Sequence, residues 1–349
     1  MKKSLFLIST ALLLVLLAAC GNDDSQKSTE DRNLKVYTTI YPIQYFAERI
    51  GGDQVEVESV LPPGSDAHNF EPTSNQMVDI AKSDAFLYSS DELETYAKTI
   101  ADAIGDKDVK IAQLADGINL LPFDEEHDHS HEATEEEHDH SHEATEEEHD
   151  HSHEATEDEH DHEEEATEEE HDHGSIDPHY WLDPERAKQM AENMKNTLVE
   201  LDPDNETTYE DNYAAVAEEL DELDQKFQHA VEGKDNKKII VSHAAYGYWE
   251  DRYGIEQIAI TGLSPTNEPS QQELEEIIHT AEDNKLNYVL FEQNISPKVA
   301  TIVQDEIGAD VLRIHNLETV TEDEIDADED YFSLMDKNIE TLEQALTNK

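Results

Sequence analysis

The sequence predicts an α/β protein in which two lobes with parallel-rich sheets are joined by one long helix. Short β-rich runs alternate with amphipathic helical segments, a pattern typical of parallel sheets covered by helices on both faces. The alternation occurs twice, before and after an uninterrupted helical segment at 203–232. A length of 349 residues fits two domains of ordinary size.

The first group of elements begins at residue 34. Residues 34–39 are β-rich, and the apolar residues of 40–50 recur at helical spacing. Pro62, Pro63 and Gly64 end a second strand. The other elements predicted in this group are strands at 55–61, 85–89 and 110–114 and a helix at 76–82.

Two aspartate–proline pairs mark the starts of the next helices. Asp183-Pro184 and Asp202-Pro203 each place an N-cap residue before proline at the first helical position. The first pair opens a helix to about residue 201, and the second opens 203–232. The apolar stripe of 203–232 has spacings of three and four: Tyr209, Tyr213, Val216, Leu220, Leu223, Phe227 and Val231. The second group then has strands at 238–242, 255–260, 287–292 and 309–314 and helices at 271–283, 297–307 and 330–346.

The charge of the chain excludes one class of partner. It has 86 acidic and 23 basic residues, a formal net charge of −63. Residues 124–173 contain 26 acidic and no basic residues, so the remainder has 60 acids, 23 bases and a charge of −37. Nucleic acid is not expected to bind, because phosphate recognition needs a basic surface.

The amino terminus resembles an export signal. Lys2 and Lys3 precede an apolar run, and Leu17-Ala18-Ala19-Cys20 resembles the bacterial lipobox, in which the cysteine carries the lipid. The alternative, a transmembrane anchor, is disfavoured because the run is shorter than the roughly 20 residues needed to span a bilayer. We predict a signal peptide at 1–19, lipidation (palmitate) at Cys20 and a flexible tether at 20–33. Since Cys20 is the single cysteine, disulfides within the chain and Cys-based zinc clusters are excluded.

An 11-residue repeat interrupts the first group of elements. It holds 13 of the 19 histidines and almost no apolar residues, so we predict a disordered insertion at 124–175. Closely spaced imidazoles suit zinc, copper or nickel, which favours accessory metal capture over a solvating spacer. The residues expected to capture metal are His127, His129, His131, His138, His140, His142, His149, His151 and His153.

Three other histidines stand at the ends of predicted elements. His68 lies in a loop after a strand, His179 precedes a helix, and His243 ends a strand. Ligands of α/β sheets collect at the carboxyl ends of strands, so a shared metal site is favoured over three structural histidines. By contrast, His229 and His279 are expected on exposed helix faces. The role of a sixth histidine, His315, stays open.

At these residues the sequence resembles a known family. The segment Gly-Ser-Asp-Ala-His-Asn-Phe-Glu-Pro at 64–72, the motif Asp-Pro-His-x-Trp-x-Asp-Pro at 177–184, the lipobox and the histidine-rich insertion look like those of zinc-binding solute-binding lipoproteins of metal ABC importers. These form the metal-binding branch of the periplasmic-type binding proteins. The resemblance covers essentially the whole chain from residue 34.

The resemblance implies a metal site in the cleft between two lobes joined by a rigid helix. Its ligands would be His68 and His179 from the first lobe and His243 and Glu318 from the second. Glu292, which ends a strand, is the competing carboxylate. Manganese-binding relatives tend to carry glutamate at the third position, so His243 indicates Zn²⁺ over Mn²⁺. Three imidazoles and one carboxylate fill the four positions of tetrahedral zinc and leave none for a substrate water.

The implied function is capture of Zn²⁺ outside the cell and its delivery to an ABC permease, by a monomer anchored by lipid to the outer face of the bacterial cell membrane. The implied boundaries are 34–202 for the first lobe, 203–232 for the linking helix and 233–349 for the second lobe. A metal-binding surface adhesin (cell adhesion) and a zinc store using the repeat are the alternatives. An enzyme is not expected, because the chain lacks His-Glu-x-x-His and Gly-x-Ser-x-Gly motifs.

Overall fold

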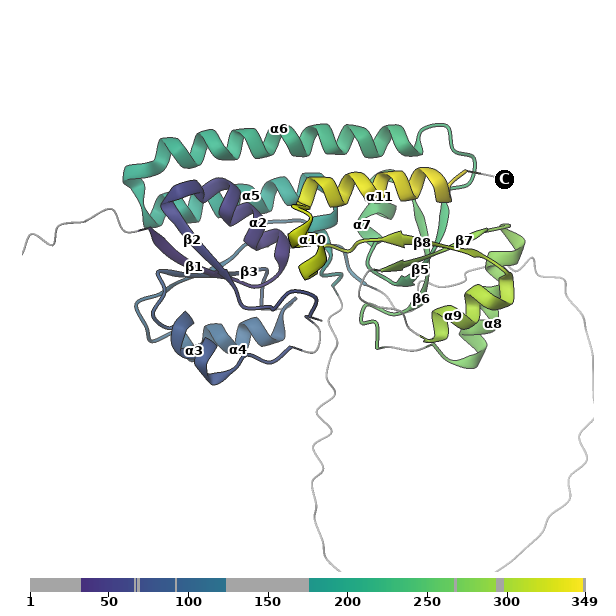
Figure 1. Ribbon diagram of the computed structural model, residues 1–349, viewed down its shortest axis with the longest axis horizontal. Coiled ribbons are helices and arrows are strands. Elements are labelled where there is room, and N and C mark those ends of the chain that lie inside the picture. Colours follow the sequence, from purple (N-terminus) through teal and green to yellow (C-terminus); the bar gives the residue numbers. More distant parts are fainter. Residues whose placement is uncertain are drawn as a thin grey trace, which may run out of the picture. The chain divides into compact units, whose positions relative to one another are not determined.

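Two four-stranded parallel sheets form the framework of the chain (Figure 1). The computed structural model describes residues 33–65, 67, 70–91, 93–123, 176–266, 269–292 and 298–347. The predicted signal peptide with Cys20, the tether up to residue 32, His68 and the insertion at 124–175 lie outside these residues. The prediction of two α/β lobes with parallel sheets is confirmed.

The first sheet has the strand order β2-β1-β3-β4, and all its pairings are parallel. Its strands are β1 (Leu34–Thr38), β2 (Val55–Ser59), β3 (Ala85–Tyr88) and β4 (Lys110–Gln113). The helices of this lobe are α2 (Tyr41–Gly51), α3 (Ser74–Ile80) and α4 (Thr95–Ile104). Because parallel strands need a crossover between them, the intervening helices follow directly from the topology.

The second sheet repeats this arrangement, with the order β6-β5-β7-β8 and parallel pairing throughout. Its strands are β5 (Lys238–His243), β6 (Glu256–Thr261), β7 (Tyr288–Glu292) and β8 (Asp310–Ile314). Its helices are α7 (Gly247–Tyr253), α8 (Gln271–Asp283), α9 (Lys298–Ile307), α10 (Glu322–Asp326) and α11 (Tyr331–Ala345).

Two long helices connect the sheets. Helix α5 (Pro184–Leu201) begins as predicted, with Asp183 as its N-cap and Pro184 in its first turn. The predicted start of the linking helix is slightly early, because Pro203–Asn205 form a 3₁₀ turn and α6 is Glu206–Val231. Helix α6 contacts α2 and α5 on the side of the first sheet and α7 and α11 on the side of the second (Figure 1).

One apolar core runs through both lobes. It joins residues of the first sheet, such as Val36, to the stripe of α6 and to Ile239 and Val241 of β5. Side chains alternate along a strand, so Ile240 faces the opposite way, into a second cluster under α8 and α9. Burial of β5 on both faces is typical of a parallel sheet covered on both sides.

Three helices of the structure were not predicted from the sequence. Helices α4, α7 and α10 were not predicted, and α7 and α10 are only 7 and 5 residues long. Short helices are marginal alone and depend on tertiary packing, so their sequence signal is weak. Within the described residues, no helix has the length and apolar character to cross a membrane.

Candidate metal centre

His179 is a fully buried side chain held by its own motif. Its segment follows Asp177 and leads through a 3₁₀ turn, Tyr180–Leu182, into α5. The Asp177 carboxylate accepts from the His179 backbone N–H at 2.9 Å, and its Oδ1 lies 2.8 Å from His179 Nδ1. The Asp177 carboxylate can accept a hydrogen bond from Nδ1–H of His179, and in that tautomer Nε2 presents the lone pair that binds a metal.

His243 is oriented in the same way by the second sheet. It is the last residue of β5, and its Nδ1 lies 2.5 Å from Oε1 of Glu292, the last residue of the neighbouring strand β7. The contact is close, but it does not have the geometry of a hydrogen bond. Burial lowers the pKa of His243, but the charges of Glu292, Glu318 and Asp177 outweigh it and raise that pKa overall.

The two imidazoles face each other from different parts of the fold, His179 from the segment before α5 and His243 from the end of β5. Their Nε2 atoms are 3.3 Å apart, and their rings meet at an angle of 62°. With each Nδ1 beside a carboxylate, two lone-pair nitrogens converge, an arrangement stabilised by a proton or a metal cation between them. Two nitrogens bonded at about 2.05 Å to one tetrahedral zinc ion lie about 3.3 Å apart. The observed separation therefore fits a shared ion.

Glu318 lies in the loop that follows β8. Its backbone N–H donates to Asn316 Oδ1 at 3.1 Å, and its carbonyl accepts from the Tyr41 N–H at 2.9 Å. Leu317, just before it, has a φ of 59°, which a non-glycine residue adopts only when its surroundings hold it. Burial and the neighbouring Glu94 raise the pKa of Tyr96, and the charge of Glu318 adds to that effect.

The two candidate carboxylates differ in how they approach His243. Glu292 contacts Nδ1, the nitrogen that points away from His179. Its other oxygen is 3.4 Å from Asn316 Nδ2, and Tyr246 OH donates to Oε1 at 3.4 Å. Glu292 thus occupies the position of an orienting group behind the ring, as carboxylates commonly do behind metal-binding histidines.

Asp177 stands two residues before His179 in the motif, but nothing in the sequence marks it as the group that orients this histidine. The same holds for Gly247, the first residue of α7. A Cβ atom at residue 247 would lie 2.7 Å from Asp177 Oδ2, which is too close for a real contact. Glycine at this position lets the backbone of α7 approach the carboxylate that holds His179.

The other three histidines of the described residues fall into two groups, two exposed and one buried. His229 and His279 are exposed on α6 and α8, as predicted. His315 is buried, and its Nδ1 accepts from the Leu317 N–H at 2.8 Å while its Nε2 lies 3.3 Å from Glu324 Oε1. The role left open for His315 is therefore structural, in the loop that carries Glu318.

The described residues do not complete a metal site by themselves. Among them, no group of three or more His, Cys, Asp or Glu side chains is arranged to hold an ion. His68, the predicted first ligand, lies outside them, as do the histidines of the repeat. What the structure brings together is the pair His179 and His243.

Comparison with known proteins agrees with this architecture. Residues 36–345 match the family model described as zinc-uptake complex component A, periplasmic. The zinc-binding lipoprotein AdcA of Streptococcus pneumoniae strain R6 is 32% identical over 342 residues, covering 98% of this chain; the chain spans 61% of that relative's length. The high-affinity zinc uptake system protein ZnuA of Bacillus subtilis is 32% identical over 347 residues, with 99% of this chain and 98% of that protein covered.

A solved structure extends the likeness to the fold. The crystal structure of the Zn(II)-bound ZnuA-like domain of Streptococcus pneumoniae AdcA has a TM-score of 0.68 and 29% sequence identity, and the match covers 90% of this chain and 99% of that one. The family match spans both sheets and every helix between them, including the segments of His179, His243 and Glu318. The chain belongs to the ZnuA family.

Proposed function

We propose that this protein captures Zn²⁺ outside the cytoplasm and delivers it to an ABC permease. The family description and the names of its relatives support this role, since they are a periplasmic zinc-uptake component, a zinc-binding lipoprotein and a high-affinity zinc uptake protein. It is a binding protein and not an enzyme, because a zinc ion with four protein ligands has no open position for a reacting water.

The observation that carries the proposal is the pair of buried imidazoles. The Nε2 atoms of His179 and His243 stand 3.3 Å apart, each on a ring whose Nδ1 is beside a carboxylate. Such carboxylates fix the orientation of the ring and raise the basicity of the ligating nitrogen. Asp177 and Glu292 thereby prepare His179 and His243 to bind one ion.

The full ligand set in this proposal is His68, His179, His243 and Glu318. Glu318 is favoured over Glu292 as the fourth ligand because Glu292 sits on the Nδ1 side of His243, across the ring from an ion bound at Nε2. With ligands from both lobes, the ion itself stabilises their closed arrangement.

Delivery requires the protein to stay at the membrane. We propose that a lipid on Cys20 anchors it to the outer face of the cell membrane as a monomer, with the permease as its partner. The histidines of the repeat would raise the local concentration of zinc near the cleft and act as an accessory to the buried site. No described residue argues for adhesion, so zinc delivery is the function proposed.

The test is a competition titration with zinc and manganese, using protein that lacks residues 124–173. We expect one tight zinc site, much weaker binding of manganese, and loss of the tight site in His243→Ala. His229→Ala, which removes an exposed histidine from α6, is the matched control and should bind zinc as the parent does. If the protein without the repeat binds no zinc tightly, the repeat is the functional element and the protein is a zinc store.

A further inference from the structure

Helix α7 connects the two imidazoles through a series of contacts. It begins four residues after His243 and packs against the segment 177–186, which carries His179. Tyr248 OH donates to the Asp177 carbonyl at 2.7 Å, and Trp249 Nε1 donates to the Leu182 carbonyl at 2.8 Å. Both donors are buried, so the two lobes share a dry contact directly beside the imidazole pair.

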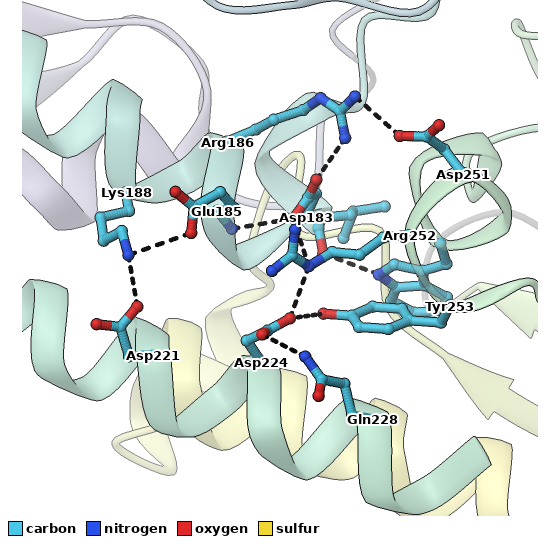
Figure 2. A network of polar contacts seen from close by, with 12 residues as sticks. Asp183, Glu185, Arg186, Lys188, Asp221, Asp224, Gln228, Asp251, Arg252 and Tyr253 are labelled. Carbon is cyan, nitrogen blue, oxygen red and sulfur yellow. Dashed lines mark hydrogen bonds and ion pairs between the residues drawn. The ribbon is translucent and has the colours of Figure 1, made fainter. Parts of the chain in front are cut away.

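A charge network continues this contact (Figure 2). Asp183, the N-cap of α5, is 1% exposed and follows His179 by four residues. Arg252 of α7 places its Nε 3.4 Å from Asp183 Oδ1 and 2.6 Å from Asp224 Oδ1 of α6. Arg252 therefore joins three helices at one point.

The network is anchored on each side. On α6, Asp224 also accepts from Tyr253 OH at 2.9 Å and from Gln228 Nε2 at 2.6 Å. On α5, Arg186 pairs with Asp183 and reaches Asp251 of α7 at 2.9 Å. The aromatic ring of Tyr253 stacks on Phe227 of α6 with centroids 5.1 Å apart, so apolar packing and charge fix the same junction.

Stability alone does not explain such a network. The Asp183 side chain is 1% exposed while that of Arg252 is 26% exposed, so the pair loses solvation mainly at the carboxylate, and this loss offsets much of the attraction between the charges. What charged partners supply is a single geometry, since each carboxylate accepts only along particular directions. The geometry here belongs to the two segments that hold His179 and His243.

We propose that the Asp183–Arg252–Asp224 network is a positioning device for the metal centre. It holds α7 against the N-terminus of α5, so the spacing of the His179 and His243 imidazoles is set before zinc arrives. Arg252 is a positioning residue, since it acts on the ligands through α5 and α7. The inference rests on the proposed zinc binding and adds that zinc selectivity depends on a charge at the lobe junction.

The test compares metal binding by Arg252→Met, Arg252→Lys and the parent protein without residues 124–173. We expect Arg252→Met to weaken zinc binding about tenfold, the low end of the roughly 10–100-fold loss for a group bonded directly to a ligand, because Arg252 acts through two helices. Manganese binding should change less, so the preference for zinc falls. Bound Co²⁺ should lose the strong visible absorption of a tetrahedral site. Arg252→Lys restores the charge without the planar fork and should recover part of both properties.

A matched control separates position from stability. Lys188→Met also removes a cation between α5 and α6, where Lys188 meets Asp221 at 2.5 Å and Glu185 at 3.1 Å, but it leaves Asp183 untouched. It should bind zinc within twofold of the parent. If Arg252→Met does not fold, the same metal-binding measurements are made on Asp224→Asn, which weakens the network and keeps a side chain of the same shape.

The outcomes are distinct. A variant that melts at lower temperature but keeps the zinc affinity, the preference over manganese and the Co²⁺ spectrum of the parent overturns the positioning role and leaves a structural one. Failure of the parent protein to bind zinc tightly overturns the proposed function instead. Equal losses in Arg252→Met and Lys188→Met would show that any lost charge between these helices has the same effect, which also overturns the inference.

Discussion

Gly247→Ala is a small change with a large expected effect on zinc binding. Residue 247 begins α7, where alanine is a good helix former, so the substitution favours the local conformation. The added Cβ, however, would lie 2.7 Å from Asp177 Oδ2. An ordinary contact begins near 3.4 Å, so the carboxylate or the helix must move by about 0.7 Å.

The magnitude follows from what that carboxylate holds. Asp177 Oδ1 lies 2.8 Å from His179 Nδ1 and accepts from the His179 N–H at 2.9 Å. A displacement of about 0.7 Å takes the Nδ1 contact beyond the upper limit of about 3.2 Å for a good hydrogen bond. Loss of such an outer-shell partner lowers metal affinity about 10–100-fold, or about 1.4–2.8 kcal/mol.

The assay is a zinc titration against a chelator of known affinity, beside thermal unfolding of the zinc-free protein. Gly105→Ala is the matched control, because Gly105 ends α4 with a φ of −57° and its Cβ would have its nearest neighbour at 3.5 Å. We expect the control to keep parental affinity. A folded Gly247→Ala protein with unchanged zinc affinity would refute the argument that Asp177 must stay in place for His179 to bind.

Two further predictions concern carboxylates paired with histidine. Glu292→Gln removes the charge that raises the pKa of His243 and the group behind its ring, so we expect about 10–100-fold lower zinc affinity at neutral pH. Because zinc needs the neutral ring, the variant should also lose zinc on acidification at a lower pH than the parent does. A pH series of zinc titrations checks both results. Burial raises the pKa of Glu324, but His315 and the N–H of Thr321 outweigh this and lower it to about 2. The ionised carboxylate therefore stabilises the fold above the unfolded value near 4.5, and this contribution is lost as the pH falls toward 2. Urea unfolding should show Glu324→Gln less stable than the parent by about 2–3 kcal/mol at pH 7, with the difference shrinking below pH 4.5; a difference constant from pH 7 to pH 2.5 would contradict the prediction.

Residues close together in the sequence were sufficient to predict the elements that have strong periodic or capping signals. The Asp183-Pro184 pair predicted the start of α5, and the stripe of α6 from Tyr209 to Phe227 lies in the core as its spacing implied. Such features depend on neighbours within a turn or two of the chain. Helix α7 could not be predicted in this way, because its 7 residues are too few for a periodic signal and its contacts come from 177–186 and α6.

The sequence by itself determined the class of fold, the family and the residue types expected to bind metal, because alternating elements and a specific motif are written along the chain. Only the tertiary structure decided which groups meet. His179 and His243 are 64 residues apart and converge within 3.3 Å because the end of β5 and the start of α5 are brought together across the lobe junction. Asp177 lies two residues before its histidine and Glu292 lies 49 residues after its own, yet both carboxylates stand beside an Nδ1 atom. The shared role is visible only from these distances in the structure.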